Sequence, residues 1–460
     1  MRRDVMRMSS VSPHDVRSNF SVGARSQHPC EKLGGSKASI DEVFLKLTAV
    51  DLFAGCGGLS LGLEKAGFET VFVNELHPVA MATYLQNRPQ SGLSEERNHC
   101  FDLLSITQKP QELDALASRL RSVHGDVDVV VGGPPCQGYS GIGHRRSFDV
   151  TKAEIPSNHL YREMARFVEV VAPKAFVFEN VRGLQNAKWT SSGEGGEIWR
   201  DVQTAFRRIR VRQGRKVLEY SIGGGLLHAR DYGVPQNRPR LILIGIRTDL
   251  QPETMPEGLY GGFLPSPTRA APDLIDLLGD LVDPRWTPGG ETTRYLTAAR
   301  NQHQRDMRTG LDGMLLGKGA ALSDQEYSKH KPEIVAKFKY MLENNGEIPV
   351  AMQTKKFAQR VLPAQWSERG PTITATSLPD DYVHFSQPRV PSVREWARLQ
   401  TFPDWYQFAG KRTTGGRRRA GDPDAGIWTR DLPKYTQIGN AVPALLGQAI
   451  GDHLRRLLGR

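Results

Sequence analysis

The 460-residue sequence has few cysteines, no long apolar run and no recognisable zinc-binding spacing. Its four cysteines, Cys30, Cys56, Cys100 and Cys136, form no C-x-x-C pair with nearby histidines, so the sequence supports neither a disulfide framework nor a zinc site. No apolar stretch is long enough to span a membrane, and residues 1–44 lack the apolar core of a secretory signal. We therefore expect a cytoplasmic protein with free thiols.

The charge of the chain favours a polyanionic partner. The formal net charge is +11 and the pI is near 9.5, and lysine and arginine side chains displace counterions from phosphate backbones. Basic residues cluster around Arg300, Lys355 and Lys411, where a solvated surface explains them equally well. Only the glycine-flanked run Arg417–Arg419 favours phosphate contact. Nucleic acid fits this composition better than an acidic metabolite does.

The pattern of elements predicts an α/β protein with several domains. Residues 1–44 lack sustained periodicity and predict a disordered basic arm. From 45 to 250, strands alternate with helices such as 158–171, which predicts a parallel sheet. Strands at 217–222 and 241–246 are expected to close that sheet.

The regular alternation of strands and helices breaks down after residue 250. Proline and glycine become frequent over 251–425, which predicts a second, smaller domain with a short strand at 372–376. Residues 426–460 form the last segment, and their apolar periodicity predicts a helix over 441–458.

A cysteine follows two prolines where an apolar run ends. Residues 127–131 predict a buried parallel strand, and Pro134, Pro135 and Cys136 follow it after two glycines. Ligands and chemistry gather at the carboxyl ends of such strands, and the prolines restrict the loop that carries the sulfur. Cys136 is therefore a candidate nucleophile. A buried structural cysteine is the competing interpretation.

A carboxyl group lies near the end of the next predicted strand. Residues 174–181 form a short apolar run that contains Glu179 close to its end. Partial desolvation there would raise the pKa of this carboxyl and let it donate a proton near neutral pH. We interpret Glu179 as a general acid paired with Cys136, although a lone glutamate more often only closes a strand.

A glycine-rich turn precedes both of these elements. A strand at 48–53 leads into Gly55 and Gly57 and then into a helix, so backbone amides can meet a ligand at the helix N-terminus. Glu75 ends the following strand, twenty residues past Gly55, where dinucleotide folds place an acid on ribose hydroxyls, and Asp102 ends the strand after that. The spacing is not G-x-G-x-x-G, which makes a nicotinamide cofactor the less favoured choice.

Taken together, these residues resemble the DNA cytosine-5 methyltransferases that use S-adenosyl-L-methionine. The resemblance runs along most of the chain and rests on six segments in the family's order: 51–58, 134–137, 179–181, 232–240, 394–403 and 437–443. It implies a Rossmann-like, mostly parallel sheet with helices on both faces, plus a smaller irregular target-recognition domain. It also implies that the helix over 441–458 returns to the catalytic domain.

The resemblance assigns roles to the candidate residues. The Cys136 thiolate would add to carbon 6 of a cytosine flipped out of double-stranded DNA, while Glu179 would hold or protonate N3. Arg238 and Arg240 would supply positive charge, with Arg240 facing the cytosine O2. The three glycines after Cys136 suit a loop that closes over DNA. The DNA-binding residues implied are Gln137, Ser140, Arg145, Arg146 and Gln236.

The family's cofactor site transfers position by position. The residues that would line it are Phe53, Gly55, Gly57, Glu75, Leu76, Asp102, Leu103, Pro135, Leu160, Asn440 and Val442. Leu76 departs from the family pattern, since many relatives place an aromatic residue there over the adenine. The family also allows a cognate restriction or defence system as a partner, and a monomer suffices for attack on one strand at a time.

Three other functions remain open at this point. A tRNA cytosine-5 methyltransferase of the same fold uses the same cysteine and acid, although the long basic region before Thr372 favours duplex DNA. A catalytically silent DNA-binding protein would not need both Cys136 and Glu179. A nicotinamide oxidoreductase would need the cofactor turn without the nucleophile segment. The recognised base sequence and the base that removes the carbon 5 proton are not readable from the chain.

Overall fold

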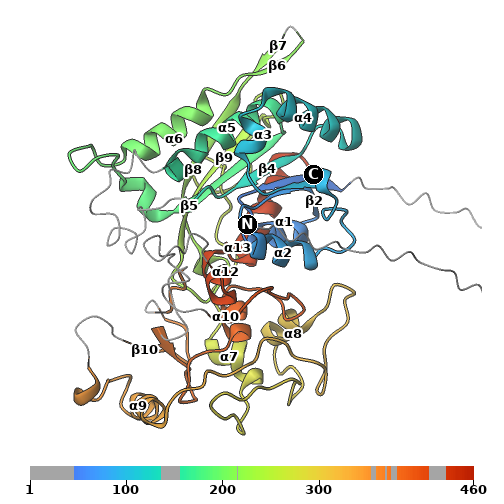
Figure 1. Ribbon diagram of the computed structural model, residues 1–460. Coiled ribbons are helices and arrows are strands. Elements are labelled where there is room, and N and C mark those ends of the chain that lie inside the picture. Colours follow the sequence, from blue (N-terminus) through green and yellow to red (C-terminus); the bar gives the residue numbers. More distant parts are fainter. Residues whose placement is uncertain are drawn as a thin grey trace, which may run out of the picture. The chain divides into compact units, whose positions relative to one another are not determined.

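A computed structural model provides the structure of the protein (Figure 1). It describes residues 46–135, 156–214, 216–353, 359–367, 370–374, 381–413 and 431–460. Residues 46–460 form one compact unit. The predicted basic arm and the Arg417–Arg419 run lie outside the described residues, and the predicted domain boundaries near 250 and 425 stay predictions.

A seven-stranded sheet organises the first half of the chain. Its strand order is β3-β2-β1-β4-β5-β9-β8, in which the first five strands are parallel, β9 is antiparallel to β5 and β8 is antiparallel to β9. The strands span Leu47–Leu52 (β1), Phe68–Asn74 (β2), His99–Cys100 (β3), Val129–Gly132 (β4), Ala175–Val181 (β5), Tyr220–His228 (β8) and Pro239–Arg247 (β9). The strand order reverses between β1 and β4, and ligands of open α/β sheets bind outside the carboxyl ends of the strands at such a point.

Helices cover both faces of the sheet, as predicted. One face carries α3 (Leu104–Thr107), α4 (Pro110–His124), α5 (Leu160–Val171) and α6 (Glu197–Arg207), and the other carries α1 (Gly58–Lys65) and α13 (Ala444–Leu457). Alternate strand residues supply the two cores: Val50 packs in the first and its neighbour Ala49 in the second. The C-terminal helix approaches α1 so closely that a Cβ at Gly62 would lie 2.4 Å from the Ala444 carbonyl oxygen.

A third core forms around the later helices. It is built from apolar residues of α7 (Leu274–Leu278), α8 (Gln302–Arg308), α10 (Val393–Leu399) and α12 (Lys434–Asn440). A smaller cluster joins α9 (Pro332–Glu343) with the short strands β10 (Arg360–Val361) and β11 (Tyr382–Val383). The remaining α-helix of the described chain is α2 (Pro78–Gln86), which follows β2.

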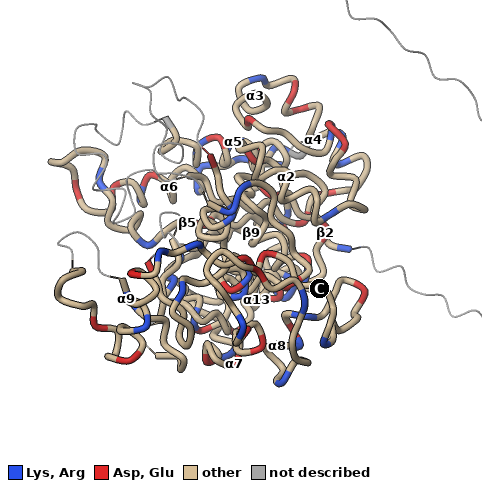
Figure 2. Tube along the Cα trace, turned by 60° about the horizontal axis from the view of Figure 1, so that its bottom comes forward, with Lys and Arg blue, Asp and Glu red and all other residues tan. Residues whose placement is uncertain are grey.

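Buried ion pairs hold the third core together. Asp280 binds Arg308 at 2.6 Å and Arg398 at 2.5 Å, and Arg398 also binds Asp404 at 2.6 Å, with all four side chains removed from solvent. Figure 2 shows acidic and basic residues close together around α7 and α8. Arg308 is therefore not part of a solvated basic surface, because buried charges need partners.

Two predicted strands differ from the structure. The segment 217–222 divides: Lys216–Leu218 (β7) pairs with Val211–Gln213 (β6) in a separate hairpin, and only the residues from Tyr220 onward join the large sheet. The described part of 372–376 is not a strand. Thr372 and Ile373 instead hydrogen-bond to the loop before β9, through the Asn237 carbonyl oxygen and the Gln236 side chain.

Among the helices of the described residues, none combines the length and the apolar composition that crossing a membrane requires. No group of three or more His, Cys, Asp or Glu side chains in this part of the chain is arranged to hold a metal ion.

Candidate active site

The site predicted from the sequence lies at the carboxyl ends of the parallel strands. Five of its predicted residues, Cys136, Gln137, Ser140, Arg145 and Arg146, lie outside the described residues. The described chain leading to them ends at Pro135, three residues past β4. The Pro134 carbonyl oxygen accepts a hydrogen bond from the Asn180 amide at 3.1 Å, which fixes this segment against the end of β5.

The turn between β1 and α1 has the glycine geometry that the sequence predicts. Phe53, Gly55 and Gly57 all have positive φ angles, of 56°, 58° and 82°. A Cβ at Gly57 would lie 2.8 Å from the Tyr406 hydroxyl and from a Tyr84 ring carbon, so packing as well as φ requires glycine there. A Cβ at Gly55 would meet nothing within 4 Å, which leaves open space beside its backbone.

Two acids stand at the ends of the next two strands. Glu75 is half-buried and accepts hydrogen bonds from the backbone N–H groups of Gly55 at 2.8 Å and His77 at 2.7 Å. Burial raises the pKa of its carboxyl, and these two N–H groups oppose the shift. Each carboxylate oxygen keeps a free lone pair, so Glu75 can still accept from a ligand hydroxyl. Asp102 is exposed, and its carboxylate accepts a hydrogen bond from Leu104 N–H at the start of α3.

The other predicted cofactor residues differ in what they offer to a ligand. Leu76 is 69 % exposed and has no aromatic ring to stack, whereas Leu103 is buried in the core and offers only its backbone. Pro135 and Asn440 are exposed, Leu160 is partly buried at the start of α5, and Val442 is buried.

Glu179 lies where an acid paired with Cys136 is expected. It is 9 % exposed, and a Cβ at Gly133 would lie 2.8 Å from its Oε2, so the carboxyl packs against the segment that leads to Cys136. Its Oε1 binds Arg240 Nε at 2.7 Å. Burial raises the pKa of Glu179, and the positive charges of Arg240 and Arg238 lower it in part. The net shift is upward, which favours a group that can carry a proton.

The two arginines of the segment before β9 have different surroundings. Arg240 remains partly accessible and binds Glu179 directly. Arg238 is buried, and its guanidinium donates to the carbonyl oxygens of Ile373, Gly439 and Ala441. Burial, with the charge of Arg240, lowers the pKa of Arg238 well below its usual range. Arg238 thus joins three chain segments, and its expected role of supplying positive charge can reach Glu179 only through space, without contact to a substrate.

Gln236, which the sequence predicts to contact DNA, forms its hydrogen bonds within the protein. It is fully buried, and its amide donates to the Leu399 carbonyl oxygen at 2.6 Å and to the Gln400 side chain at 2.7 Å. Its own oxygen accepts from Ile373 N–H. The prediction that Gln236 contacts DNA is therefore wrong, because all of its polar atoms are bonded inside the protein.

Sequence reasoning missed the buried side chains that hydrogen-bond to the glycine turn and to one another. Tyr406 donates to the Cys56 carbonyl oxygen at 2.6 Å, and Arg88 bonds Tyr406 at 3.1 Å and Glu64 at 2.6 Å. Burial raises the pKa of the nearby Asp51 to about 7, against the opposing influence of Ser60 and Arg88. Tyr406 lies 350 positions from Cys56, so no local pattern could have paired them.

The comparisons with known proteins agree with this geometry. Residues 47–456 match the family model of C-5 cytosine-specific DNA methylases. The chain is 31% identical over 423 residues to the type II methyltransferase M.DdeI of Desulfomicrobium norvegicum, covering 89% of this chain and 88% of that one. It is also 31% identical over 428 residues to the type II methyltransferase M.XorII of Xanthomonas oryzae pv. oryzae, covering 89% and 84%.

A solved structure shares the fold. The crystal structure of a prophage-encoded Escherichia coli protein, described as a DNA modification methyltransferase, superimposes with a TM-score of 0.62 at 22% sequence identity. The match covers 90% of this chain and 100% of that one. At this identity the likeness concerns the fold alone.

Proposed function

Because this chain belongs to the C-5 cytosine-specific DNA methylase family, we propose that it methylates carbon 5 of cytosine in double-stranded DNA through a covalent bond to Cys136. The chain is a DNA methyltransferase by family, and the relatives named above are type II enzymes. The observation that carries the proposed mechanism is the buried Glu179 carboxyl, packed against Gly133 and bonded to Arg240 at 2.7 Å.

Each step follows from a group on this chain. The Cys136 thiolate forms a bond to carbon 6 of the cytosine, and the electron pair of the 5,6 double bond moves toward carbon 5 and N3. Glu179 donates its proton to N3 as negative charge develops there, and it takes this proton back when the thiolate departs. Arg240 orients the Glu179 carboxyl and offers its remaining N–H groups to O2. After carbon 5 is methylated, the proton on carbon 5 leaves to a base, the double bond re-forms and the thiolate departs.

The two cysteines that the structure describes, Cys56 and Cys100, suit this step poorly. Burial raises the pKa of both Cys56 and Cys100 to about 12, so each thiol stays protonated near neutral pH. Cys56 also donates its S–H to the Gln437 carbonyl oxygen at 3.4 Å. A protonated thiol is a poor nucleophile, which supports Cys136 as the reactive sulfur.

S-adenosyl-L-methionine would bind along the carboxyl edge of β1, β2 and β3. When bound there it supplies an electrophilic methyl group. The open space at Gly55, the spare acceptor capacity of Glu75 and the exposed Asp102 suit its amino acid and ribose groups. Asn440 and the backbone of Leu103 are further contacts that we propose, and Leu76 would offer only an aliphatic surface to the adenine.

Replacing Glu75 by glutamine tests this cofactor site. Glutamine has one carbonyl oxygen in place of two, so it cannot accept from Gly55, His77 and a ribose hydroxyl together. We expect the Kd for S-adenosyl-L-methionine, measured by calorimetry, to rise about tenfold, which corresponds to one lost charge-assisted hydrogen bond. The matched control is Glu69→Gln, an exposed residue on the same strand. Equal affinities for Glu75→Gln and the unchanged protein would contradict the assignment.

Label transfer decides between the proposed substrate and its alternative. The protein is incubated with S-adenosyl-L-methionine carrying a labelled methyl group and with duplex DNA or tRNA in separate reactions. We expect label at carbon 5 of cytosine in DNA. Label in tRNA alone would replace the DNA proposal with tRNA methylation, and label in neither would count against both. Conversion sequencing of a random DNA library that the protein has methylated then gives the recognised sequence. A nuclease gene next to the gene for this protein, encoding an enzyme that cuts the same sequence, would support a restriction partner.

A further inference from the structure

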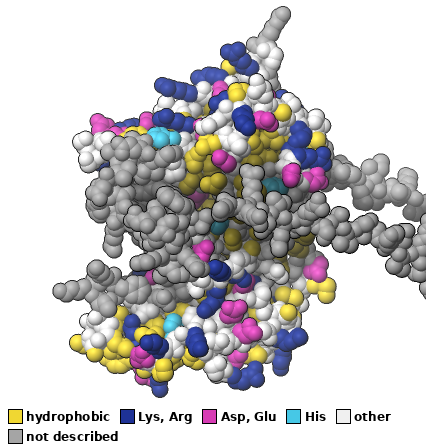
Figure 3. All heavy atoms as spheres, viewed as in Figure 1, with side chains coloured by type: hydrophobic (Ala, Val, Ile, Leu, Met, Phe, Trp, Pro, Cys, Tyr) yellow, Lys and Arg dark blue, Asp and Glu magenta, His cyan; other side chains and the backbone are white. Residues whose placement is uncertain are grey.

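A dense basic segment lies away from the predicted site. Six of the ten residues in 207–216 are lysine or arginine, and none is acidic. The segment covers the end of α6 and the β6–β7 hairpin, where Figure 3 shows basic side chains gathered on the surface. Arg208 and Arg212 belong to it and are exposed.

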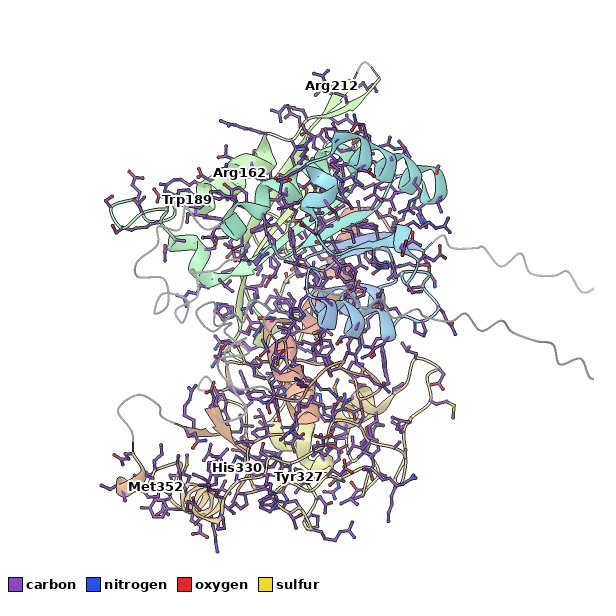
Figure 4. The ribbon with its side chains drawn as sticks, viewed as in Figure 1. Arg162, Trp189, Arg212, Tyr327, His330 and Met352 are labelled. Carbon is purple, nitrogen blue, oxygen red and sulfur yellow. The ribbon has the colours of Figure 1, made fainter. Side chains whose placement is uncertain are left out.

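Arginines of α5 extend this surface. Arg162 and Arg166 are one helical turn apart and exposed, and they line a groove of about 590 Å³ together with Arg208. Figure 4 labels Arg162 on α5 and Arg212 on β6. We call Arg162, Arg166, Arg208 and Arg212 the basic strip.

Little negative charge offsets the basic strip. Within the described part of the chain, none of its four arginines forms an ion pair, whereas the neighbouring Arg210 binds Glu219 at 3.1 Å. Glu169 is the single acid lining the groove, and it accepts a hydrogen bond from the Arg210 backbone. Unpaired exposed arginines create a positive potential that attracts phosphates.

One end of the basic strip lies near the start of β5, at the end of that strand opposite to Glu179. Tyr220, just after the hairpin, donates to the carbonyl oxygen of Pro173, which precedes β5. Glu179 lies near the other end of this seven-residue strand, about 20 Å away at the usual rise per residue. The part of the strip next to the hairpin, Arg208 and Arg212, therefore lies at the end of β5 away from Glu179.

We propose that the basic strip binds the phosphate backbone of DNA flanking the methylated site, without reading its sequence. A protein partner is less favoured, because the centres of protein interfaces are depleted of charge and the segment exposes mainly arginine and lysine. This inference rests on the proposed function for the DNA it names, and it adds a second contact region to that substrate.

The test neutralises three arginines of the strip and compares long DNA with short DNA. The variant Arg166→Gln/Arg208→Gln/Arg212→Gln is matched by Lys109→Gln/Arg455→Gln/Arg460→Gln, which removes three exposed basic residues elsewhere. Binding to a mixed-sequence duplex of about 60 base pairs is measured by anisotropy at several salt concentrations. Three lost phosphate contacts should make the slope of log K against log salt shallower by about 2 to 3.

The same variant should behave normally on a duplex too short to reach the strip. We expect its KM and kcat on a target duplex of about 10 base pairs, which extends about 17 Å to either side of the flipped cytosine at about 3.4 Å per base pair, to equal those of the control variant. An unchanged salt slope on the long duplex would overturn the proposal and would instead favour an acidic protein partner. If the unaltered protein binds DNA through the strip but transfers no methyl group, the proposed function fails while this inference stands.

Discussion

Replacing Cys136 by alanine is expected to abolish methyl transfer while DNA binding persists. Without the sulfur, carbon 5 has no electron supply strong enough to attack the methyl group, so the rate should fall at least about a thousandfold. Turnover is measured with labelled S-adenosyl-L-methionine and binding by anisotropy.

The matched control for this experiment is Cys100→Ala. The Cys100 thiol lies at the carboxyl edge of β3, and its pKa of about 12 keeps it protonated, so its removal should leave turnover near that of the unaltered protein. DNA containing 5-fluorocytosine gives a second readout, because the fluorine on carbon 5 cannot leave as a proton does. We expect a covalent protein–DNA complex with the unaltered protein and with Cys100→Ala. The same complex with Cys136→Ala would refute the assignment of the nucleophile.

Replacing Glu179 by glutamine is expected to lower kcat by about 10²- to 10⁴-fold, the usual contribution of general acid catalysis. Glutamine keeps the shape of the side chain, and its carbonyl oxygen can still accept from Arg240, so folding and DNA affinity should change little. What it cannot do is carry a proton to N3. The control is Glu112→Gln, an exposed glutamate on α4, for which we expect no change in kcat.

The pH dependence follows from the direction of the Glu179 shift. Burial raises the pKa of this acid, so the protonated form that serves N3 is present below the raised pKa and is lost as the pH rises through it. The Cys136 thiolate is needed as well and increases with pH. The profile of kcat should therefore rise and then fall, and the residual activity of Glu179→Gln should lack the fall on the alkaline side. A fall that persists in this variant would assign that limb to another group.

Much of the fold and part of the site were predictable from the chain alone. The runs that became β1, β2, β4 and β5 are short, apolar and β-branched, so their burial in a parallel sheet follows from local composition. The glycine turn was readable because Gly55 and Gly57 have positive φ angles, which favour glycine, and close packing requires glycine at Gly57 as well. The order of the six segments then led to the family that the comparisons confirm.

What the tertiary structure alone decided is the environment of each polar side chain. Gln236 and Arg238 belong to a segment that resembles a substrate-facing motif, yet both are buried and bonded to segments more than 130 positions away. Tyr406 hydrogen-bonds to the glycine turn from 350 positions away in the chain. Local sequence determines which strand or turn forms, because periodicity and φ preferences act over a few residues. Whether a charge or amide faces solvent, substrate or a distant carbonyl depends on which segments the fold brings together.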